Sequence, residues 1–221
     1  MFIGHFALSF AAKRATPRVS LAMLFVAAQF ADLLWPALLA LGIEQVTIEP
    51  GITVVTPLNF ISYPYSHSLV MLVIWGALLA FVYRKTTGKR DAFFVLAGLV
   101  VSHWVLDFVT HRPDLPLYPG SAKFGLGLWN SFGATVAVEV TMYAAGVWIY
   151  LTATRARDGI GRWALWGLIA LLFVSYLGNL VSPPPPSVAA IYTLGLIAGA
   201  LTLVWAWWID RHREVVGGVR P

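Results

Sequence analysis

Long apolar stretches alternate with short polar segments along almost the whole chain. Six of them approach or exceed the roughly 20 apolar residues that a helix needs to cross the hydrocarbon core of a bilayer. They are the stretches 19–42, 67–84, 91–111, 128–152, 162–182 and 187–209. A further apolar run, residues 2–12, is too short to cross and predicts a half-helix that dips in from one side or is buried against the bundle. The pattern therefore predicts an all-α, polytopic membrane helix bundle of about six transmembrane helices plus this short N-terminal half-helix.

The composition agrees with a chain whose solvent is mostly lipid. Of the 221 residues, 59% are hydrophobic and 11% are charged, whereas a soluble domain carries roughly 25% charged residues. No long polar linker divides the chain, so residues 1–221 are expected to form a single integral membrane domain. The sequence contains no Cys, which excludes disulfides and thiolate metal sites.

The positive charges indicate membrane orientation rather than a nucleic-acid partner. The net charge is +5, but Lys and Arg lie in short blocks between the apolar stretches. Of the 15 Lys and Arg residues, all but Arg112 and Lys123 fall on one side of the six-span arrangement. Because cytoplasmic loops carry the excess of Lys and Arg, that side and both chain termini are expected to be cytoplasmic. Membrane lipids are the expected partners and nucleic acid is not; the pattern carries no prediction of oligomeric state.

Ionisable residues in or beside the apolar stretches are the candidates for function. They are Asp32, His103, Asp107 and Glu139 inside spans, His67 and His111 at outer helix ends, and His5 in the short N-terminal run. Such groups are costly in hydrocarbon, so they normally face a bundle interior or a wet cavity and have a partner. His103, Asp107 and His111 follow an i, i+4, i+8 pattern and share one helix face. Imidazole and carboxylate on one face suit zinc, manganese or iron, but a hydrogen-bonded polar stripe explains the spacing equally well.

The depth of these residues predicts one polar layer. At about 1.5 Å of rise per residue, Asp32 lies about 15 Å and His103 about 12 Å inside the outer ends of their spans, with Glu139 at a similar level. His5 reaches the same layer if residues 2–12 form a re-entrant helix. Unpaired carboxylates at that depth must be protonated or bind a cation. A divalent metal ion satisfies them, and so does a proton-sharing polar core or a proton path; the residues alone leave both open.

Four short motifs in the first half of the chain carry a family resemblance. They are Gly4-His5, the turn Ala31-Asp32-Leu33-Leu34-Trp35-Pro36, the loop Tyr65-Ser66-His67-Ser68, and the helix His103-Trp104-Val105-Leu106-Asp107-Phe108-Val109-Thr110 with its tail Pro116-Leu117-Tyr118-Pro119. In these motifs, over about residues 1–120, the chain resembles the membrane-bound, metal-dependent hydrolases of the LexA-regulated type, a bacterial inner-membrane family. The last three spans match only in being hydrophobic. Two departures stand out: Leu34 and Trp35 replace a second Asp and a His, and Ser62-Tyr63-Pro64 replaces His-Arg-Gly.

The resemblance implies a metal-dependent hydrolase in the bacterial inner membrane. Its ligands to one or two divalent ions, zinc first and manganese or iron as alternatives, would be His5, Asp32, His67, His103 and Asp107, with His111 compensating for missing ligands. Glu139, or Asp32 where it is not a ligand, would be the catalytic carboxylate. The implied substrate is a lipid or lipid-linked phosphate ester at the outer leaflet, whose anionic head group could meet Arg112 and Lys123. A site that binds one metal, or binds without hydrolysing, fits the departures as well.

Two functions of other classes use the same polar layer. An ion or proton transporter would need a continuous polar path to both faces, and the apolar cytoplasmic halves of the spans argue against one. A non-catalytic membrane scaffold would use the layer only to fix helix register and would bind no metal. Two local patterns add structural expectations: Gly195 and Gly199 favour a close helix contact, and the alternation from Val46 to Val55 allows a short hairpin within residues 43–66.

Overall fold

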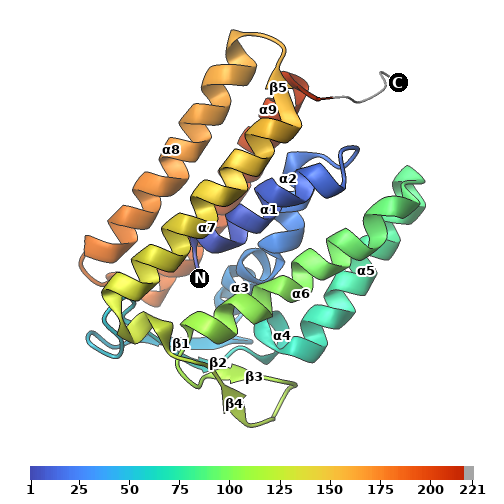
Figure 1. Ribbon diagram of the computed structural model, residues 1–221. Helices are drawn as coiled ribbons and strands as arrows, with labels where there is room; N and C mark the ends of the chain where they lie inside the picture. The colour runs from blue at the N-terminus through green and yellow to red at the C-terminus, as the bar shows by residue number, and fades with distance from the viewer. Residues whose placement is uncertain (217–221) are drawn as a thin grey trace.

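The computed structural model describes residues 1–216 and is a bundle of long helices, as the apolar pattern predicts (Figure 1). The long helices are α5 (Leu69–Thr87), α6 (Phe93–Thr110), α7 (Phe132–Ala153), α8 (Gly159–Val181) and α9 (Val188–Arg211). Within the described residues, five helices are long and apolar enough to cross a membrane, or six if the bent pair α2–α3 is one span. The short 3-10 helix Arg90–Ala92 leads into α6, and another, Leu128–Asn130, precedes α7.

The first span differs from the continuous stretch that the hydropathy predicts. Residues 19–42 form two helices, α2 (Leu21–Ala28) and α3 (Phe30–Ala40), bent by 60° at Gln29. Ser20 caps the start of α2, its side chain accepting from the backbone N–H of Met23 at 3.1 Å. At the bend, the carbonyl of Ala28 accepts a hydrogen bond from His103 Nδ1 at 2.8 Å. A side chain of another helix therefore satisfies a backbone group at the break and links the bend to the polar layer.

The N-terminal run forms α1 (Ile3–Ala15), which is buried rather than exposed to lipid. Ile3 and Phe10 are fully buried, and α1 lies against α7, α2 and α6 (Figure 1). Its closest neighbour is α7, where a Cβ on Gly146 would collide with the backbone of Ala7. This short buried helix confirms the second of the two arrangements expected for residues 2–12, and it begins at mid-depth in the bundle (Figure 1).

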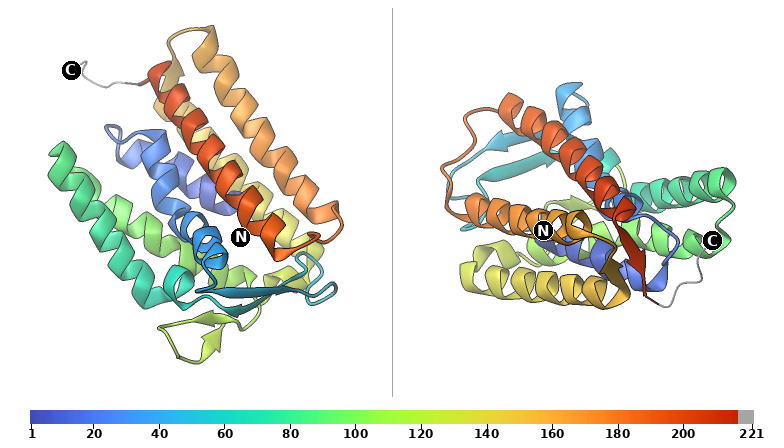
Figure 2. Two further views of the ribbon diagram at one scale, coloured as in Figure 1. Left: turned by 180° about the vertical axis from the view of Figure 1, so that it is seen from behind. Right: turned by 90° about the horizontal axis from the view of Figure 1, so that it is seen from above.

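Two groups of long helices flank α1 and α2. One group contains α5 and α6, which pack against each other; the other contains α7, α8 and α9 (Figures 1 and 2). Each group has its own cluster of buried apolar side chains, one including Phe10, Phe25 and Leu165 and the other Leu24 and Leu96. Because α1 and α2 contribute to these clusters, they join the two groups through their buried faces.

Short strands close the two ends of the bundle. At one end, β1 (Gln45–Ile48) and β2 (Leu58–Ser62) form an antiparallel hairpin, followed by the short helix α4 (Pro64–His67), and β3 (Leu115–Pro116) pairs with β4 (Lys123–Phe124). The expected hairpin within 43–66 is present, but its second strand begins at Leu58, after the alternating segment. At the other end, β5 (Thr154–Ala156) and β6 (Arg213–Val215) pair and tie α7 to the end of α9.

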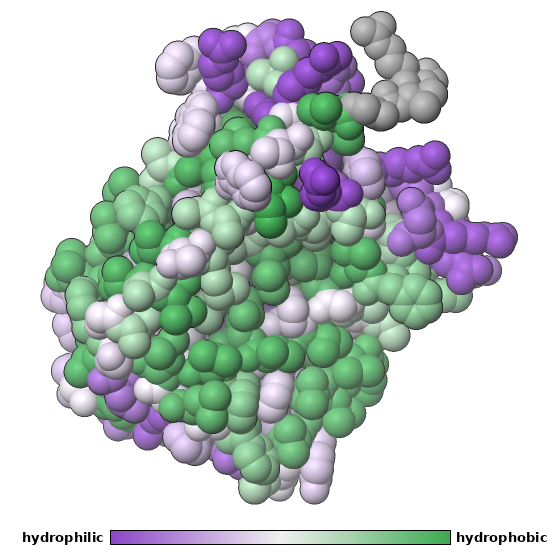
Figure 3. Space-filling view, viewed as in Figure 1, coloured by the Kyte–Doolittle hydropathy of each residue, from purple (hydrophilic) through white to green (hydrophobic). Residues whose placement is uncertain are grey.

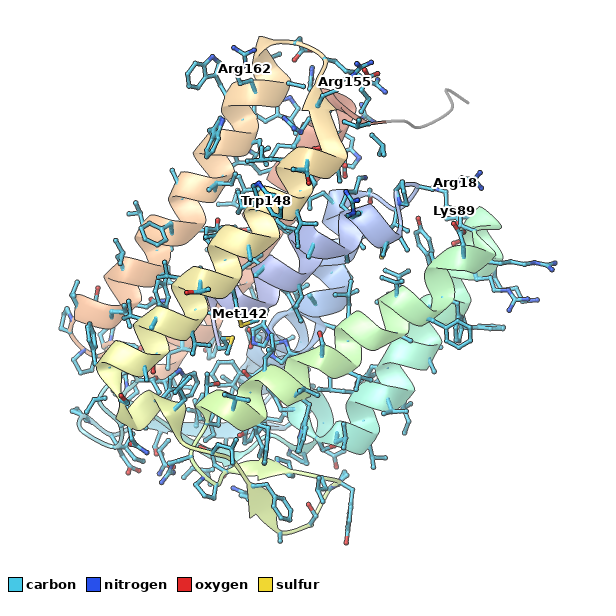
Figure 4. The ribbon with its side chains drawn as sticks, in the orientation of Figure 1. Arg18, Lys89, Met142, Trp148, Arg155 and Arg162 are labelled. Atoms are coloured by element: carbon cyan, nitrogen blue, oxygen red, sulfur yellow. The ribbon has the colours of Figure 1, made fainter. Side chains whose placement is uncertain are left out.

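The surface separates these two ends by polarity. Figure 3 shows hydrophilic residues gathered at the upper end and an apolar belt below them. Figure 4 places Arg18, Lys89, Arg155 and Arg162 at that upper end, which we call the basic end; we call the opposite one the hairpin end. On α9, Gly195 and Gly199 face Pro36 and Leu33 of α3, which confirms the close helix contact expected from their spacing.

Candidate metal centre

Five of the predicted side chains meet inside the bundle. His5 comes from the start of α1, Asp32 from α3, His67 from the end of α4, and His103 and Asp107 from α6. His67 and His103 face Asp32 Oδ1 with their Nε2 atoms, at 3.5 and 3.7 Å, and face Asp107 Oδ2 at 3.9 and 3.2 Å. His5 Nε2 lies 3.1 Å from the other oxygen of Asp107. The structure therefore brings together residues that the sequence separates by up to a hundred positions.

Four of these atoms are linked through His–Asp contacts, although Asp32 and Asp107 fall in different groups of candidate ligand atoms. His67 Nε2, His103 Nε2, Asp32 Oδ1 and Asp107 Oδ2 are joined by four distances between 3.2 and 3.9 Å. Metal–ligand bonds of about 2.1 Å in a tetrahedron would place neighbouring ligand atoms about 3.4 Å apart. We call these four residues the metal centre, and their donor set of two imidazoles and two carboxylates suits a divalent ion.

A second group of donors shares His103. The candidate ligand atoms of His5, His103 and Asp107 lie within 4.8 Å of one another, as do those of Asp32, His67 and His103. The rings of His5 and His103 are stacked at 3.7 Å between centroids. The amino group of Met1 also lies 2.5 Å from Asp107 Oδ1, so this oxygen has two nitrogen neighbours. Asp107 therefore contacts both groups: its Oδ1 faces Met1 and His5 of the N-terminal segment, and its Oδ2 faces His67 and His103.

The outer nitrogens of these imidazoles are held by other groups. His67 Nδ1 lies 2.7 Å from Ser66 Oγ, and that hydroxyl donates to Glu44 at 2.6 Å. His103 Nδ1 donates to the carbonyl of Ala28 at 2.8 Å. Such contacts select the tautomer whose Nε2 carries a free lone pair, and they orient the ring as in known metal centres. Both Nε2 atoms therefore face the carboxylates with their lone pairs available.

Two buried nitrogens of the site, His5 Nδ1 and His103 Nε2, lack a hydrogen-bond partner among the described residues. His103 is fully buried, and its Nε2 has no hydrogen-bond partner although it lies 3.2 Å from Asp107 Oδ2. A buried polar atom without a partner costs free energy, and buried polar groups are normally satisfied. An ion bound between His103 and the two carboxylates would satisfy the nitrogen and offset the paired negative charges, so the residues present fit a metal.

His111 lies at the rim of the site rather than among the closest donors. Its Nε2 is 3.8 Å from Asp107 Oδ2, and its ring lies 4.2 Å from that of Trp129. Its Nδ1 contacts Asp114 Oδ1 at 2.9 Å, and Tyr63 donates to the same oxygen at 2.8 Å. Burial, followed by the charge of Asp114, raises the pKa of Tyr63 well above its usual value, so its hydroxyl remains a donor.

Glu139 faces the site from α7 but is in neither donor group. Its Oε2 accepts hydrogen bonds from the backbone N–H of Phe2 at 2.8 Å and of Gly4 at 3.4 Å. A carboxylate at this position satisfies N–H groups at the start of α1 and is favoured by the helix dipole. Both contacts use Oε2, and Glu139 also lines the cavity described next. Glu139 therefore anchors the helix that carries His5 and presents its other oxygen to the site.

A cavity of about 420 Å³ reaches the metal centre. Asp32, His67, Asp107, His111 and Glu139 line its inner part. The side chain of Asp32 is 41% exposed, whereas that of Asp107 is 3% exposed. Asp32 is therefore the carboxylate of the metal centre that a molecule in the cavity would meet.

The two basic residues of the hairpin end do not line this cavity. Arg112 donates to the side chain of Asn59 and lies 3.3 Å from Asp114 Oδ2. Lys123 Nζ donates to the backbone carbonyl of Ile61 at 2.8 Å. Both side chains thus fasten the β1–β2 hairpin over the site, which differs from the head-group contact expected from the sequence.

Comparison with known families identifies residues 1–182 as matching the model of the YdjM inner membrane protein family. The chain belongs to this family. No curated protein and no solved structure matches the chain significantly. Together with its apolar helices, the family match makes this a multi-pass inner membrane protein.

Membership of the YdjM inner membrane family extends farther than the sequence motifs indicated. The expected resemblance ended near residue 120, whereas the family match continues to residue 182 and includes all of α7 and α8. The difference has a physical reason, because Glu139 of α7 is tied to the start of α1. The helices after residue 120 thus belong to the architecture that holds the site.

Two residues that support the site were not singled out as candidates from the sequence. Asp114 lies three positions after His111, and this spacing in a turn is the signal that could have identified it. Glu44 accepts hydrogen bonds from Tyr65 N, Ser66 N and Ser66 Oγ, but it lies 22 positions before Ser66. No sequence pattern links Glu44 to His67, because the fold of residues 43–66 creates their contact.

Proposed function

We propose that this protein is a membrane-embedded, metal-dependent hydrolase whose ion is held by Asp32, His67, His103 and Asp107. The proposal is supported above all by the convergence of two imidazole Nε2 atoms on two carboxylates, with each Nδ1 held from outside. A merely structural polar cluster gains nothing from this arrangement, because it leaves His103 Nε2 without a hydrogen bond. Zinc is the ion proposed first, with manganese or iron as alternatives.

The reaction that this site would support is hydrolysis of a phosphate ester. A bound divalent ion supplies a Lewis acid for the phosphoryl oxygen and lowers the pKa of a coordinated water. The protein's own contribution is to orient the substrate beside Asp32, which is the exposed carboxylate of the centre. Glu139 would accept the proton of the attacking water through the oxygen that α1 does not use.

We place the site in the outer leaflet of the inner membrane. Lys and Arg gather at the basic end, and the rule that positive loops remain inside puts that end and both termini in the cytoplasm. The metal centre lies toward the hairpin end, among helices long enough to span the bilayer. A lipid or lipid-linked phosphate ester is therefore the proposed substrate.

Transport of ions or protons is less well supported by the same geometry. Between the metal centre and the basic end, α1 and α2 pack through Phe10, Leu24 and Phe25, all fully buried. This apolar layer interrupts a polar path among the described residues, and a transporter would need one.

The test combines metal analysis with an activity screen. Detergent-purified parent protein is expected to contain about one zinc, manganese or iron per chain and to cleave lipid phosphate esters. The double variant His103→Ala/Asp107→Ala is expected to lose both. A matched control is His212→Ala/Asp158→Ala, which removes a His–Asp pair of 2.7 Å at the basic end and should retain metal and activity.

The outcomes test the hydrolase against the transporter. A folded parent that takes up no metal, even after incubation with each ion, overturns the hydrolase. Metal-dependent ion flux in liposomes without ester cleavage would favour a transporter. A double variant that retains both metal and activity would show that the ligands lie elsewhere.

A further inference from the structure

The cavity beside the metal centre extends to the lateral surface of the bundle. From the polar inner part it continues along Leu180 at the end of α8, the Pro183–Pro186 turn, and Ile191 and Leu194 of α9. Asp32 and Trp35 of α3 and residues 55–58, up to the start of β2, also line it. The cavity thus changes from ionisable side chains at the metal centre to apolar side chains at its lateral end.

The apolar wall belongs to a helix that faces lipid. Helix α9 contains an 18-residue apolar segment, long enough to cross a membrane, in which no residue is buried inside the protein. Leu194 in this helix is 65% exposed. Figure 2, in the view from behind, shows α9 running across the surface beside α3. A helix with this composition and exposure is solvated by hydrocarbon in a membrane. The cavity therefore borders lipid on its α9 side, at Leu194.

The contact between α3 and α9 limits where the cavity can open. At Gly195, a Cβ would lie 3.0 Å from Pro36 Cγ, so the two helices touch there. The cavity-lining residues of α9 are Ala190, Ile191 and Leu194, which all precede Gly195 toward the hairpin end. The helices touch at Gly195, so the space between α3 and α9 is closed toward the basic end. It is open only nearer the hairpin end.

We propose that this lateral cavity is a chain-binding groove that receives the hydrocarbon tail of a membrane lipid phosphate ester while the head group reaches the metal centre. The proposal rests on the proposed function and names the part of the lipid that the site recognises. The volume of about 420 Å³ accommodates a head group and the first part of one chain, and the remainder of the chain stays in the bilayer.

The charges of the residues that line the groove favour an amphiphilic lipid, rather than a soluble anion, as its ligand. No Lys or Arg is found among its described lining residues, whereas Asp32, Asp107 and Glu139 are. Met1 also lines the groove, but its amino group is paired with Asp107 Oδ1 at 2.5 Å, so a free anion would meet mainly the ion and these carboxylates. A lipid brings its phosphate to the ion by partitioning into the membrane, so its binding does not depend on a basic pocket.

The test compares two alkyl phosphates on metal-loaded protein in a neutral detergent. Leu194→Trp fills the groove, and Leu201→Trp is the control: Leu201 is 63% exposed, lies two turns farther along α9 and does not line the cavity. Dodecyl phosphate and butyl phosphate share a head group and differ in the tail. We expect Leu194→Trp to raise the Kd of dodecyl phosphate about tenfold and to change that of butyl phosphate less than about twofold, a difference of about 1 kcal/mol or more.

The readouts distinguish failure of the groove from failure of the hydrolase. Bound metal, measured first, should be equal in the parent and both variants. Suppose that bound metal is equal and that Leu194→Trp raises the Kd of both alkyl phosphates equally, or of neither. This result would contradict the chain-binding groove and leave the proposed metal centre intact. An equal loss of dodecyl phosphate binding in Leu201→Trp also overturns the groove. A parent without metal overturns the proposed function and the head-group placement together.

Discussion

Two buried polar clusters lie at the two ends of α1, and they are built differently. His5 near the start of α1 belongs to the metal-centre region, and Lys13 in its last turn belongs to a cluster at the basic end. Lys13 Nζ donates to the carbonyl of Val19 at 2.6 Å and lies 3.3 Å from Asp210 Oδ1. The other oxygen of Asp210 accepts from the backbone N–H of Leu21. Both charges of this cluster, Lys13 and Asp210, therefore have specific protein partners.

The metal-centre region is satisfied only in part, because Asp107 Oδ1 is paired with the amino group of Met1 and with His5 whereas other atoms are not paired. Two carboxylates, Asp32 and Asp107, face the same two imidazoles, and His103 Nε2 remains without a hydrogen bond. The Nδ1 atoms of His67 and His103 are held by groups outside the cluster, Ser66 and the carbonyl of Ala28. The comparison teaches that a structural cluster pairs its charges inward, whereas a ligand-binding cluster keeps matched donors directed at one shared point.

The largest effect on stability is expected at the basic end. Lys13→Met leaves Asp210 buried without its cation, and breaking a buried ion pair costs about 3–5 kcal/mol of unfolding free energy. Bound metal should be unchanged in the folded fraction. Unfolding in mixed detergent and denaturant, with metal analysis of the folded protein, measures both quantities.

The control for this prediction removes the second charge as well. Lys13→Met/Asp210→Asn keeps an acceptor for Leu21 N and leaves no unpaired charge, so it should recover part of the loss. If Lys13→Met reduces bound metal as much as it reduces stability, the two clusters are not separate in function.

A smaller effect is expected where α1 joins the two clusters. Gly146→Ala would place a methyl group against the backbone oxygen of Ala7, and a backbone atom cannot move aside as a side chain can. Overpacking of this kind costs about 1–3 kcal/mol. Because the displaced helix carries His5, the affinity for metal should fall together with stability.

The matched control is a glycine of the same helix with free space around it. A Cβ on Gly133 would meet nothing within 4 Å, so Gly133→Ala should be neutral or slightly stabilising. Equal destabilisation by the two substitutions would mean that the α1–α7 contact is not tight. The comparison uses denaturant midpoints and zinc titrations of both variants.

Much of this architecture could be predicted from the sequence, because its causes are local. Apolar length identified the five long helices, and the shortness of residues 2–12 separated α1 from them. The cost of charge in hydrocarbon singled out Asp32, His103 and Asp107, and helical periodicity placed the last two on one face. These arguments need only composition and spacing.

The remainder depends on contacts that no local pattern contains. The bend at Gln29 has neither Gly nor Pro at the break, and His103 of another helix satisfies Ala28 there. Glu139 had the depth of a site residue, but its hydrogen bonds to Phe2 and Gly4 follow from how α7 packs on α1. The support of His67 by Glu44 likewise requires the folded hairpin.

The residues behind the ligands give the next prediction. Asp114→Asn weakens the hold on His111 Nδ1 and on Tyr63, which together orient the rim of the site. Loss of such supporting contacts typically lowers metal affinity about 10- to 100-fold, and we expect the lower part of this range because His111 is not among the closest donors. Asp91→Asn, an exposed acid at the other end, is the matched control. An unchanged zinc Kd in Asp114→Asn would place His111 outside the functional site.

The smallest effect concerns an exposed pair at the basic end, outside the spans. Asp158 caps α8 through Gly161 N at 2.8 Å, and His212 Nδ1 lies 2.7 Å from its other oxygen. The hydrogen bond from His212, and then that from Gly161 N, lower the pKa of Asp158 below its usual value. A lowered pKa in the folded state means that this pair stabilises the fold above the unfolded-state pKa of about 3.9. That contribution is lost as the pH falls through the folded value.

Asp158→Asn isolates this contribution, because Asn still caps a helix but carries no charge. The parent should melt slightly above the variant at pH 7, and the two melting temperatures should converge as the pH falls below about 4. Bound metal at pH 7 should be the same in both, since the pair lies at the opposite end from the metal centre. A difference in melting temperature that persists unchanged at pH 3 would show that the charge is not its source. The result would then assign the difference to the hydrogen-bond geometry of the Asp158 side chain with Gly161 N and His212 rather than to its charge.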